Sequence, residues 1–124
     1  MAPGRGPEMG RRWRWGARGA GLYGLYPTLV LLMISKGHTH GYEIKRRIEE
    51  LTGSPLPEGL IYVTLRRLEA SGLVVSTPVP GDPRGKRVYQ LTPAGWQVLS
   101  ARLAELRAMK GFIDAVLRFY EGGP

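Results

Sequence analysis

The sequence has no cysteine, few acidic residues and no long uninterrupted apolar run. Without cysteine, a disulfide framework and any thiolate-dependent metal or nucleophile site are excluded. The longest apolar stretch, residues 29–34, is far shorter than the roughly 20 residues that span a bilayer. Glycines and a proline separate it from Arg11 and Arg12, and no small-residue cleavage site follows. We therefore expect neither export nor membrane insertion, and a cytoplasmic protein.

The charge balance is strongly basic, with 18 lysine and arginine residues against 10 acidic ones and a net charge of +8. Residues 1–24 carry five basic residues against one acidic, residues 25–95 nine against six, and residues 96–124 four against three. Such a surplus favours a polyanionic partner, either nucleic acid or a membrane surface, although solubility explains part of it. A length of 124 residues, 43% of them hydrophobic, suits one globular domain.

Residues 1–24 are rich in glycine and arginine, and a flexible basic arm is expected there. Arginines at positions 11, 12 and 14 interleave with Trp13 and Trp15. This pattern suits contacts with a phosphate backbone and stacking or minor-groove insertion. It equally suits an untethered basic tail, and both interpretations stay open.

A first helix is predicted over residues 26–36, with Pro27 in its first turn and Gly37 as its stop. It is apolar nearly all round, which predicts burial against several elements. A second helix is predicted over residues 39–51, capped by Thr39 or His40 and stopped before Gly53. The residues expected to face the core from this second helix are Ile44, Ile48 and Leu51.

A third helix is predicted over residues 56–71, with Pro57 in its first turn and Gly72 as a left-handed stop. Its apolar stripe consists of Ile61, Leu65 and Leu68. The opposite side carries Gly59, Val63, Arg66 and Arg67, and the flanks carry Leu60, Tyr62 and Thr64. A basic outer face suits phosphate contact, although a solvated surface helix is the plain alternative.

Two β-rich segments follow, residues 73–77 and residues 87–91, joined by the turn-rich stretch PVPGDPRGK. The far side of this connection carries Arg84, Lys86 and Arg87. Three helices followed by a basic hairpin form a winged helix-turn-helix, an α+β fold that is mainly helical. In that fold the third helix enters the major groove, and the wing touches the flanking backbone.

The last helix is predicted to begin at Thr92-Pro93, a capping residue followed by proline, and to end near Tyr120. Alternating steps of four and three residues make a coiled-coil seam of Leu99, Leu103, Leu106, Lys110, Ile113, Leu117 and Tyr120. A second apolar edge consists of Met109, Phe112, Val116 and Phe119. A rod of roughly 28 residues is about 42 Å long, more than so small a domain can cover.

We therefore expect a homodimer formed along this rod, with an interface of the seam residues and Val116. Packing of the whole rod onto its own domain is the alternative. The expected organisation is an arm over residues 1–24, a winged-helix domain over residues 25–95 and a dimerisation helix over residues 96–124.

Three linked stretches resemble the PadR family of transcriptional regulators: HGYE at residues 40–43, G-x-I-Y-x-x-LRRLE-x-x-GLV at residues 59–74, and RVYQLTPAG at residues 87–95. The resemblance covers about residues 25–120 and is closest to the short subgroup with one C-terminal helix. It implies a homodimeric winged-helix repressor that binds a palindromic operator in double-stranded DNA. It also implies that a small, frequently aromatic or hydrophobic molecule releases the operator.

The resemblance also implies which residues contact DNA. The expected set is Tyr42, Gly59, Leu60, Tyr62, Val63, Thr64, Arg66, Arg67, Arg84, Lys86 and Arg87. Three of these positions depart from the family pattern or stay open. Leu60 stands where the family has a hydroxyl residue, Val63 stands where proline or arginine is common, and Tyr62 could instead be a packing ring.

Effector pockets in the family are commonly lined by the last and first helices. The candidates here are Leu29, Met33, Trp96, Phe112 and Phe119. Trp96 could instead be a core tryptophan, which is the more common role for such a residue. Leu103 and Leu106 occupy the region where members that sandwich flat drugs have an aromatic residue, which argues against that mechanism.

Enzyme motifs are missing from the sequence: it has no P-loop and no glycine fingerprint after a strand. His38 and His40 form an H-x-H pair without a supporting third ligand, so a helix-entry role is favoured over a metal site. We expect no enzymatic activity, no cofactor and no metal. A nonspecific or architectural nucleic-acid binder acting through its arm, and an adaptor that pairs its rod with another protein, stay as alternatives.

Overall fold

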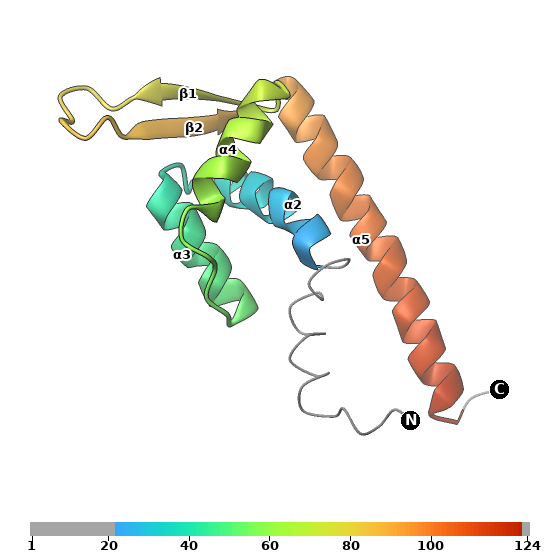
Figure 1. Ribbon diagram of the computed structural model, residues 1–124. Helices are drawn as coiled ribbons and strands as arrows, with labels where there is room; N and C mark the ends of the chain where they lie inside the picture. The colour runs from blue at the N-terminus through green and yellow to red at the C-terminus, as the bar shows by residue number, and fades with distance from the viewer. Residues whose placement is uncertain (1–21, 123–124) are drawn as a thin grey trace.

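The structure, a computed structural model, describes residues 22–122, which form four helices and one hairpin. The elements are, in order, α2 (Leu22–Ser35), α3 (Gly41–Thr52), α4 (Leu60–Ala70), β1 (Val74–Pro78), β2 (Arg87–Leu91) and α5 (Pro93–Tyr120). Figure 1 shows three helices beside a hairpin, with α5 running away from them as a long rod. The predicted winged helix-turn-helix with a long C-terminal helix is confirmed. The predicted arm lies outside the described residues, except for residues 22–24 at the start of α2.

Helix α2 is the central element, and α3, α4, α5 and β2 all pack against it. Its buried residues are Tyr26, Thr28, Val30, Leu31, Met33 and Ile34, which confirms the expectation of burial on several sides. The helix begins at Leu22, so the placement of Pro27 in the first turn was wrong. Pro27 lies inside α2 with its ring exposed, and burial of the apolar run offsets the one backbone hydrogen bond that proline cannot make.

Helix α3 follows a short turn and has His40 as its N-cap residue, although the His40 side chain makes no capping hydrogen bond. Gly53 ends it in the left-handed conformation (φ 74°), as predicted. Ile44 and Ile48 are fully buried, but Leu51 is 60% exposed. The prediction for Leu51 was wrong because the last turn of α3 projects past the core, where Glu50 and Gly53 are exposed as well.

Helix α4 begins at Leu60 and not at residue 56, so the placement of Pro57 in its first turn was also wrong. Two features keep residues 56–59 outside this helix. The carboxylate of Glu49 accepts the backbone N–H of Leu56 at 2.8 Å and holds the segment against α3. Gly59 adopts a left-handed conformation (φ 84°), which a right-handed helix cannot continue through. At the other end, Gly72 (φ 78°) is the left-handed stop that the sequence predicts.

The hairpin pairs β1 and β2 in antiparallel register, with Ser76 opposite Tyr89 and Pro78 opposite Arg87. The bounds of β2 are those predicted, and β1 begins one residue later than predicted. The root of the wing is joined to the α2–α3 turn, because Tyr89 donates its N–H to the carbonyl of Thr39 at 3.0 Å. His40 also forms an isolated bridge with Val88. The start of α3 is therefore fixed beside the wing.

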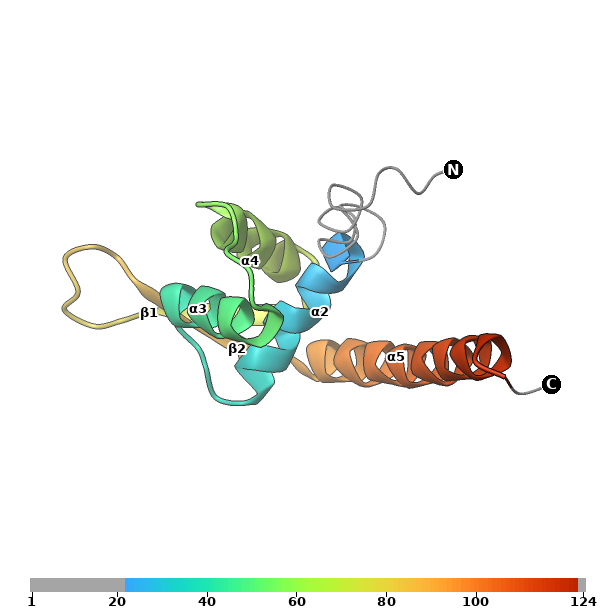
Figure 2. The same ribbon diagram turned by 90° about the horizontal axis from the view of Figure 1, so that it is seen from below.

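Helix α5 has the bounds that the sequence predicts, Pro93–Tyr120. The Thr92 hydroxyl accepts the N–H of Gly95 at 3.0 Å and donates to the carbonyl of Gly72 at 2.6 Å. The first turns of α5 pack on the domain, where Gly95 and Leu99 are buried, whereas residues 107–120 are exposed throughout. Figure 2 shows this second half of α5 extending beyond every other helix and strand.

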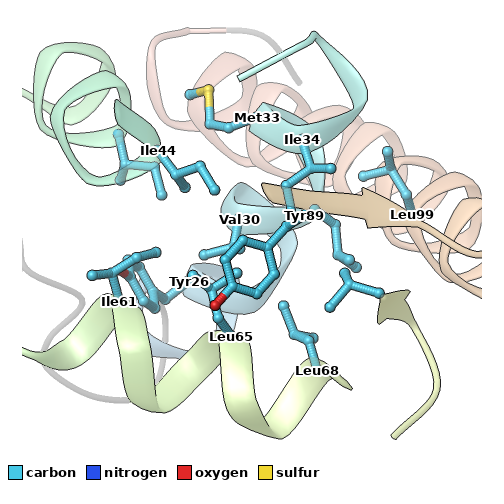
Figure 3. Close-up of a cluster of buried hydrophobic side chains, with 13 residues drawn as sticks. Tyr26, Val30, Met33, Ile34, Ile44, Ile61, Leu65, Leu68, Tyr89 and Leu99 are labelled. Carbon is cyan, nitrogen blue, oxygen red and sulfur yellow. The ribbon is translucent and has the colours of Figure 1, made fainter. Parts of the chain in front are cut away.

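The core gathers side chains from all of these elements around α2 (Figure 3). The ring of Tyr89 points from β2 toward α4 and Leu65. Leu99 belongs to this core and is only 4% exposed. Its predicted place in a dimer interface was therefore wrong, because the first turns of α5 use their apolar side to close the domain.

Candidate nucleic-acid interface

The two sides of α4 differ as the sequence predicts. Its inner side consists of the buried residues Ile61, Leu65 and Leu68. Its outer side presents Tyr62, Val63, Arg66 and Arg67 to solvent. The outer face of α4 is therefore a basic and aromatic surface about three turns long.

Two other residues expected at this face turn inward. Thr64 is 7% exposed, and its hydroxyl donates to the carbonyl of Leu60 at 2.9 Å. Its predicted contact with DNA was wrong because the hydroxyl is used inside the helix. Leu60 is partly buried and packs against the core, while Gly59 forms the exposed left-handed corner before it.

The start of α3, the outer side of α4 and the wing surround a cleft of about 440 Å³. It is lined by Tyr42, Tyr62, Arg84, Lys86 and Arg87, all of them in the predicted set, and also by His40, Gly41, Gly85 and Tyr89. Sequence reasoning missed those last four. His40 and Gly41 belong to the same HGYE motif as Tyr42, and that motif could have indicated that they lie near the cleft. The positions of Gly85 and Tyr89 depend on the twist of the hairpin.

Two aromatic rings shape the wall of this cleft. A Cβ atom added to Gly41 would lie 2.7 Å from Cε1 of Tyr62, so glycine is what allows the Tyr62 ring to lie against the start of α3. The ammonium group of Lys86 lies 5.1 Å from the centroid of the Tyr42 ring, a cation–π distance that joins the wing to α3. Tyr42 and Tyr62 are nevertheless 54% and 47% exposed, so both rings also remain available to a ligand.

Arg87 is held by its own hairpin. Its Nε donates to the Ser76 hydroxyl at 2.7 Å, and one terminal nitrogen donates to the Ser76 carbonyl at 3.3 Å. The Ser76 hydroxyl in turn donates to the carboxylate of Glu69 on α4 at 3.0 Å. The pKa of the nearby Tyr89 is raised, first by burial and then by the Glu69 carboxylate.

Charge is distributed unevenly over the described residues. Lys45 and Arg47 of α3, and Arg102 and Lys110 of α5, each lie 3.0 to 3.2 Å from a carboxylate. Within residues 22–122, no ion pair includes any of the five cations of α4 and the wing, which are Arg66, Arg67, Arg84, Lys86 and Arg87. The cleft lining also has three of these cations and no carboxylate. The positive charge of the cleft lining is therefore not offset by a carboxylate within it, which favours the binding of anions there.

Two carboxylates support the start and the end of α3 instead. Glu43 accepts a hydrogen bond from Nδ1 of His38 at 2.9 Å, and this bond lowers the pKa of the Glu43 carboxyl. The N–H of Leu56, followed by Lys45, lowers the pKa of Glu49. His38 thus holds the entry to α3, and the described residues contain no cluster of three potential metal ligands.

A family model named the Transcriptional regulator PadR-like family matches residues 30–101, more than half of the chain. The chain belongs to this family. It is 44% identical over 71 residues to the Transcriptional regulator Rv3488 of Mycobacterium tuberculosis, covering 57% of this chain and 65% of that protein. It is 37% identical over 84 residues, 67% of this chain, to a 37.1 kDa protein of transposon TN4556 of Streptomyces fradiae, of which it spans only 23%.

Solved structures share this PadR-like fold. The chain matches a PadR family transcription regulator from Clostridium difficile R20291 with a TM-score of 0.66 and 28% identity, covering 75% of this chain and 98% of that one. The matched region of the family model ends at residue 101. Most of the exposed part of α5 therefore lies beyond the segment that defines the family.

That part of α5 carries an apolar surface which nothing in the described PadR-like chain covers. The exposed residues there are Met109, Phe112, Ile113, Val116, Leu117, Phe119 and Tyr120. Phe112 is 69% exposed and Phe119 is 70% exposed, values that are unusual for phenylalanine. Leu103 and Leu106 are half-buried, and Lys110 pairs with Asp114 of its own helix.

The predicted effector residues do not form one site in this PadR-like chain. Met33 is buried in the core and Leu29 packs partly against it. Trp96 is 51% exposed, so the interpretation of Trp96 as a core tryptophan was wrong. Phe112 lies 16 residues further along α5, about 24 Å away. Neither cleft found in the described residues includes any of these side chains.

Among residues 22–122, no helix combines the length and the hydrophobicity that crossing a membrane requires.

Proposed function

We propose that the protein is a dimeric transcriptional repressor that recognises a palindromic operator in double-stranded DNA. The observation that carries this proposal is the outer face of α4 together with the cleft beside it, where exposed tyrosines meet cations that form no ion pair among residues 22–122, with no carboxylate in the lining. Phosphate contacts need such cations, and base-edge contacts need long side chains on a helix that can enter the major groove. Membership of a family of transcriptional regulators supports the same function.

Arg66 and Arg67 are proposed to read or position bases, because both are exposed on the outer side of α4. A bidentate arginine–guanine contact contributes about 1–3 kcal/mol of discrimination against the wrong base. Arg84 and Lys86 are proposed to contact phosphates from the wing, since both line the cleft and neither has a carboxylate partner among residues 22–122. Tyr42 and Tyr62 are proposed to contact the backbone between these two groups.

The dimer part of the proposal is supported by the exposed apolar residues of α5. Pairing of two rods would bring two α4 helices to one duplex, about one helical turn or 34 Å apart. A single α4 with one wing would reach few base pairs and bind weakly. The dimer interface proposed here consists of Leu103, Leu106, Lys110, Ile113, Val116, Leu117 and Tyr120.

Regulation by a small aromatic or hydrophobic effector completes the proposal. Of the candidate residues, Trp96 has an accessible ring in the first turn of α5, and Leu29 is partly accessible on α2. A molecule bound there in the dimer would change the spacing of the two α4 helices. Operator affinity should then fall while the fold of each subunit persists.

Selection of bound fragments from a random duplex pool with the purified full chain tests the function. We expect a symmetric site with two half-sites, and a weaker affinity for that site after Arg66→Gln or Arg67→Gln. Arg107→Gln is the matched control, because it removes one exposed cation of α5 remote from the cleft. Equal affinity for random and selected duplexes, abolished by deletion of residues 1–20, would instead favour the nonspecific binder.

A further inference from the structure

Arg87 and Ser76 share one face of the hairpin, although the sequence separates them by 11 residues. Ser76 lies opposite Tyr89, and Arg87 lies two residues before Tyr89 on β2. Residues two apart on a strand point to the same side, so Arg87 and Ser76 are diagonal neighbours. The buried ring of Tyr89, on the same face as both, turns toward α4 (Figure 3), so this is the hairpin face that faces α4.

The Ser76 hydroxyl connects the two charged groups on either side of it. It accepts from Arg87 Nε at 2.7 Å and donates to the Glu69 carboxylate oxygens at 3.0 and 3.2 Å. A serine hydroxyl can accept and donate at once, so Glu69, Ser76 and Arg87 form one continuous hydrogen-bonded chain. Glu69 lies one residue before the end of α4, and Arg87 is the first residue of β2. The chain therefore ties the end of α4 through the middle of β1 to the loop end of β2.

The position of the chain matters because the wing extends away from the domain beyond it (Figure 1). Lys86 is the residue directly before Arg87, and Arg84 stands at the wing tip, where its N–H donates to Asp82 at 2.8 Å. A change of hairpin angle at Arg87 would move both cations relative to α4. The guanidinium of Arg87 is linked to the Glu69 carboxylate through the Ser76 hydroxyl, which weakens its own attraction for a phosphate.

We propose that Arg87 is a positioning residue and not a DNA contact: the Glu69–Ser76–Arg87 chain sets the angle of the wing against α4 so that Arg84 and Lys86 reach the phosphates. This inference rests on the proposed function and replaces the role that the sequence predicts for Arg87. It also assigns a role to Ser76 and Glu69, which the sequence did not single out.

The experiment measures operator affinity of the full chain as a function of salt concentration. A residue that contacts phosphate reduces the salt slope by about 1 when its charge is removed. We expect Lys86→Gln to do so. We expect Ser76→Ala, which removes no charge, to weaken binding about tenfold, a change of about 1.4 kcal/mol, with the slope unchanged. Arg87→Gln should weaken it equally with the slope unchanged, and the double variant should be no weaker than either single one.

Two conservative variants keep the test independent of folding defects. Ser76→Thr retains the hydroxyl and suits a strand, so it should restore wild-type affinity. Arg87→Lys retains the charge but loses the planar fork that holds both Ser76 oxygens, so it should bind as weakly as Arg87→Gln. In the free protein, the Arg87 Nε–H should exchange with solvent more slowly in the wild type than in Ser76→Ala.

The opposite pattern overturns the inference. If Arg87→Gln lowers the salt slope by about 1 while Ser76→Ala and Arg87→Lys bind normally, Arg87 is an ordinary phosphate contact. The proposed function would then still stand, because Lys86→Gln and Arg66→Gln would behave as described. If the wild type shows no preference for any duplex sequence, the function itself fails and this inference fails with it.

Discussion

The fold leaves no room for a side chain at Gly95. A Cβ atom there would overlap the carbonyl oxygen of Leu73. That oxygen accepts the N–H of Thr92 at 3.1 Å, so it cannot move away without loss of a backbone hydrogen bond. Since the obstacle is backbone and not a flexible side chain, α5 would have to shift as a whole.

Substitution of this glycine should therefore destabilise the protein. We expect Gly95→Ala to lower the free energy of unfolding by about 1–3 kcal/mol through overpacking, measured by urea denaturation. Gly111→Ala is the control, because a Cβ added there would meet no described atom within 4 Å apart from the adjacent residues and backbone of its own helix. It should raise helix stability by about 1 kcal/mol. Equal unfolding midpoints for the two variants would contradict this account of Gly95.

Tyr26 is a buried phenol whose hydroxyl has no hydrogen-bond partner among residues 22–122. Burial, with a smaller contribution from the Glu49 carboxylate, raises the pKa of Tyr26 from 10.0 to about 12. The folded state therefore holds the phenolic proton more tightly than the unfolded state does. The stability that this provides is complete below pH 10 and is lost as the pH rises toward 12.

The matched measurement compares wild type with Tyr26→Phe by denaturant unfolding between pH 8 and pH 12. Over that range the free energy of unfolding of the wild type should fall by up to about 3 kcal/mol relative to that of the variant. Each unit of pKa shift corresponds to about 1.4 kcal/mol. Near neutral pH the variant should be at least as stable as the wild type, because the buried hydroxyl has no hydrogen bond to residues 22–122 to lose. Parallel stability curves across the whole range would contradict this account, because they would mean that the Tyr26 phenol has the same pKa in the folded and unfolded states.

At the scale of elements, the junction between β2 and α5 depends on Thr92. Its hydroxyl caps α5 through Gly95 and also donates to Gly72 at the end of α4. We expect Thr92→Ala to cost about 1–2 kcal/mol, the usual effect of losing an N-cap. Thr92→Ser keeps both hydrogen bonds and should cost much less. Thermal unfolding of the two variants checks this, and an equal loss would mean that the Thr92 methyl group is the stabilising part.

Local signals of this kind made the element bounds of α5 and β2 predictable from sequence. A capping residue followed by proline fixed the start of α5, and the left-handed glycines at 37, 53 and 72 fixed three stops. The start of α4 was missed because it depends on Glu49 binding the Leu56 N–H, a contact between segments that propensity does not describe. The same holds for Pro27, which tertiary burial keeps inside α2.

The candidate site was predictable to the extent that helical periodicity decides which side chains face outward. It placed Val63, Arg66 and Arg67 on the outer side of α4 correctly. It did not foresee that the Thr64 hydroxyl would bond within the helix, or that Ser76 would engage Arg87. Both contacts depend on side-chain rotamers and on strand register, which the spacing of residues along the sequence does not determine.

At the scale of the whole molecule, the two proposed activities lie on different parts of the fold. The wing and the outer face of α4 carry five cations that form no ion pair among residues 22–122, whereas the free half of α5 carries the exposed apolar residues (Figures 1 and 2). A change in the rod can therefore alter assembly without touching the cleft. Dimerisation and DNA contact can be separated by mutation.

The double variant Ile113→Glu/Leu117→Glu is designed to disrupt dimerisation without altering the DNA-contacting residues. The two residues are one turn apart on the same side of α5 and are 46% and 49% exposed, so the single chain should fold unchanged. Charges facing each other across a paired rod should leave a monomer at micromolar concentration, measured by sedimentation equilibrium. Because the second half-site then binds independently, operator affinity should fall about 100-fold or more. Binding to an isolated half-site should not change.

The matched control is Ala108→Glu, which adds one glutamate on roughly the opposite side of the same rod. It should leave both the dimer and operator affinity intact. If the double variant remains dimeric, the rods do not pair through this face, and the second apolar edge of Phe112, Val116 and Phe119 becomes the surface to alter next. If the unaltered chain is itself monomeric and still protects a symmetric site, the duplex would have to bring the two copies together. In that case the rod would contribute to affinity only after the first copy has bound.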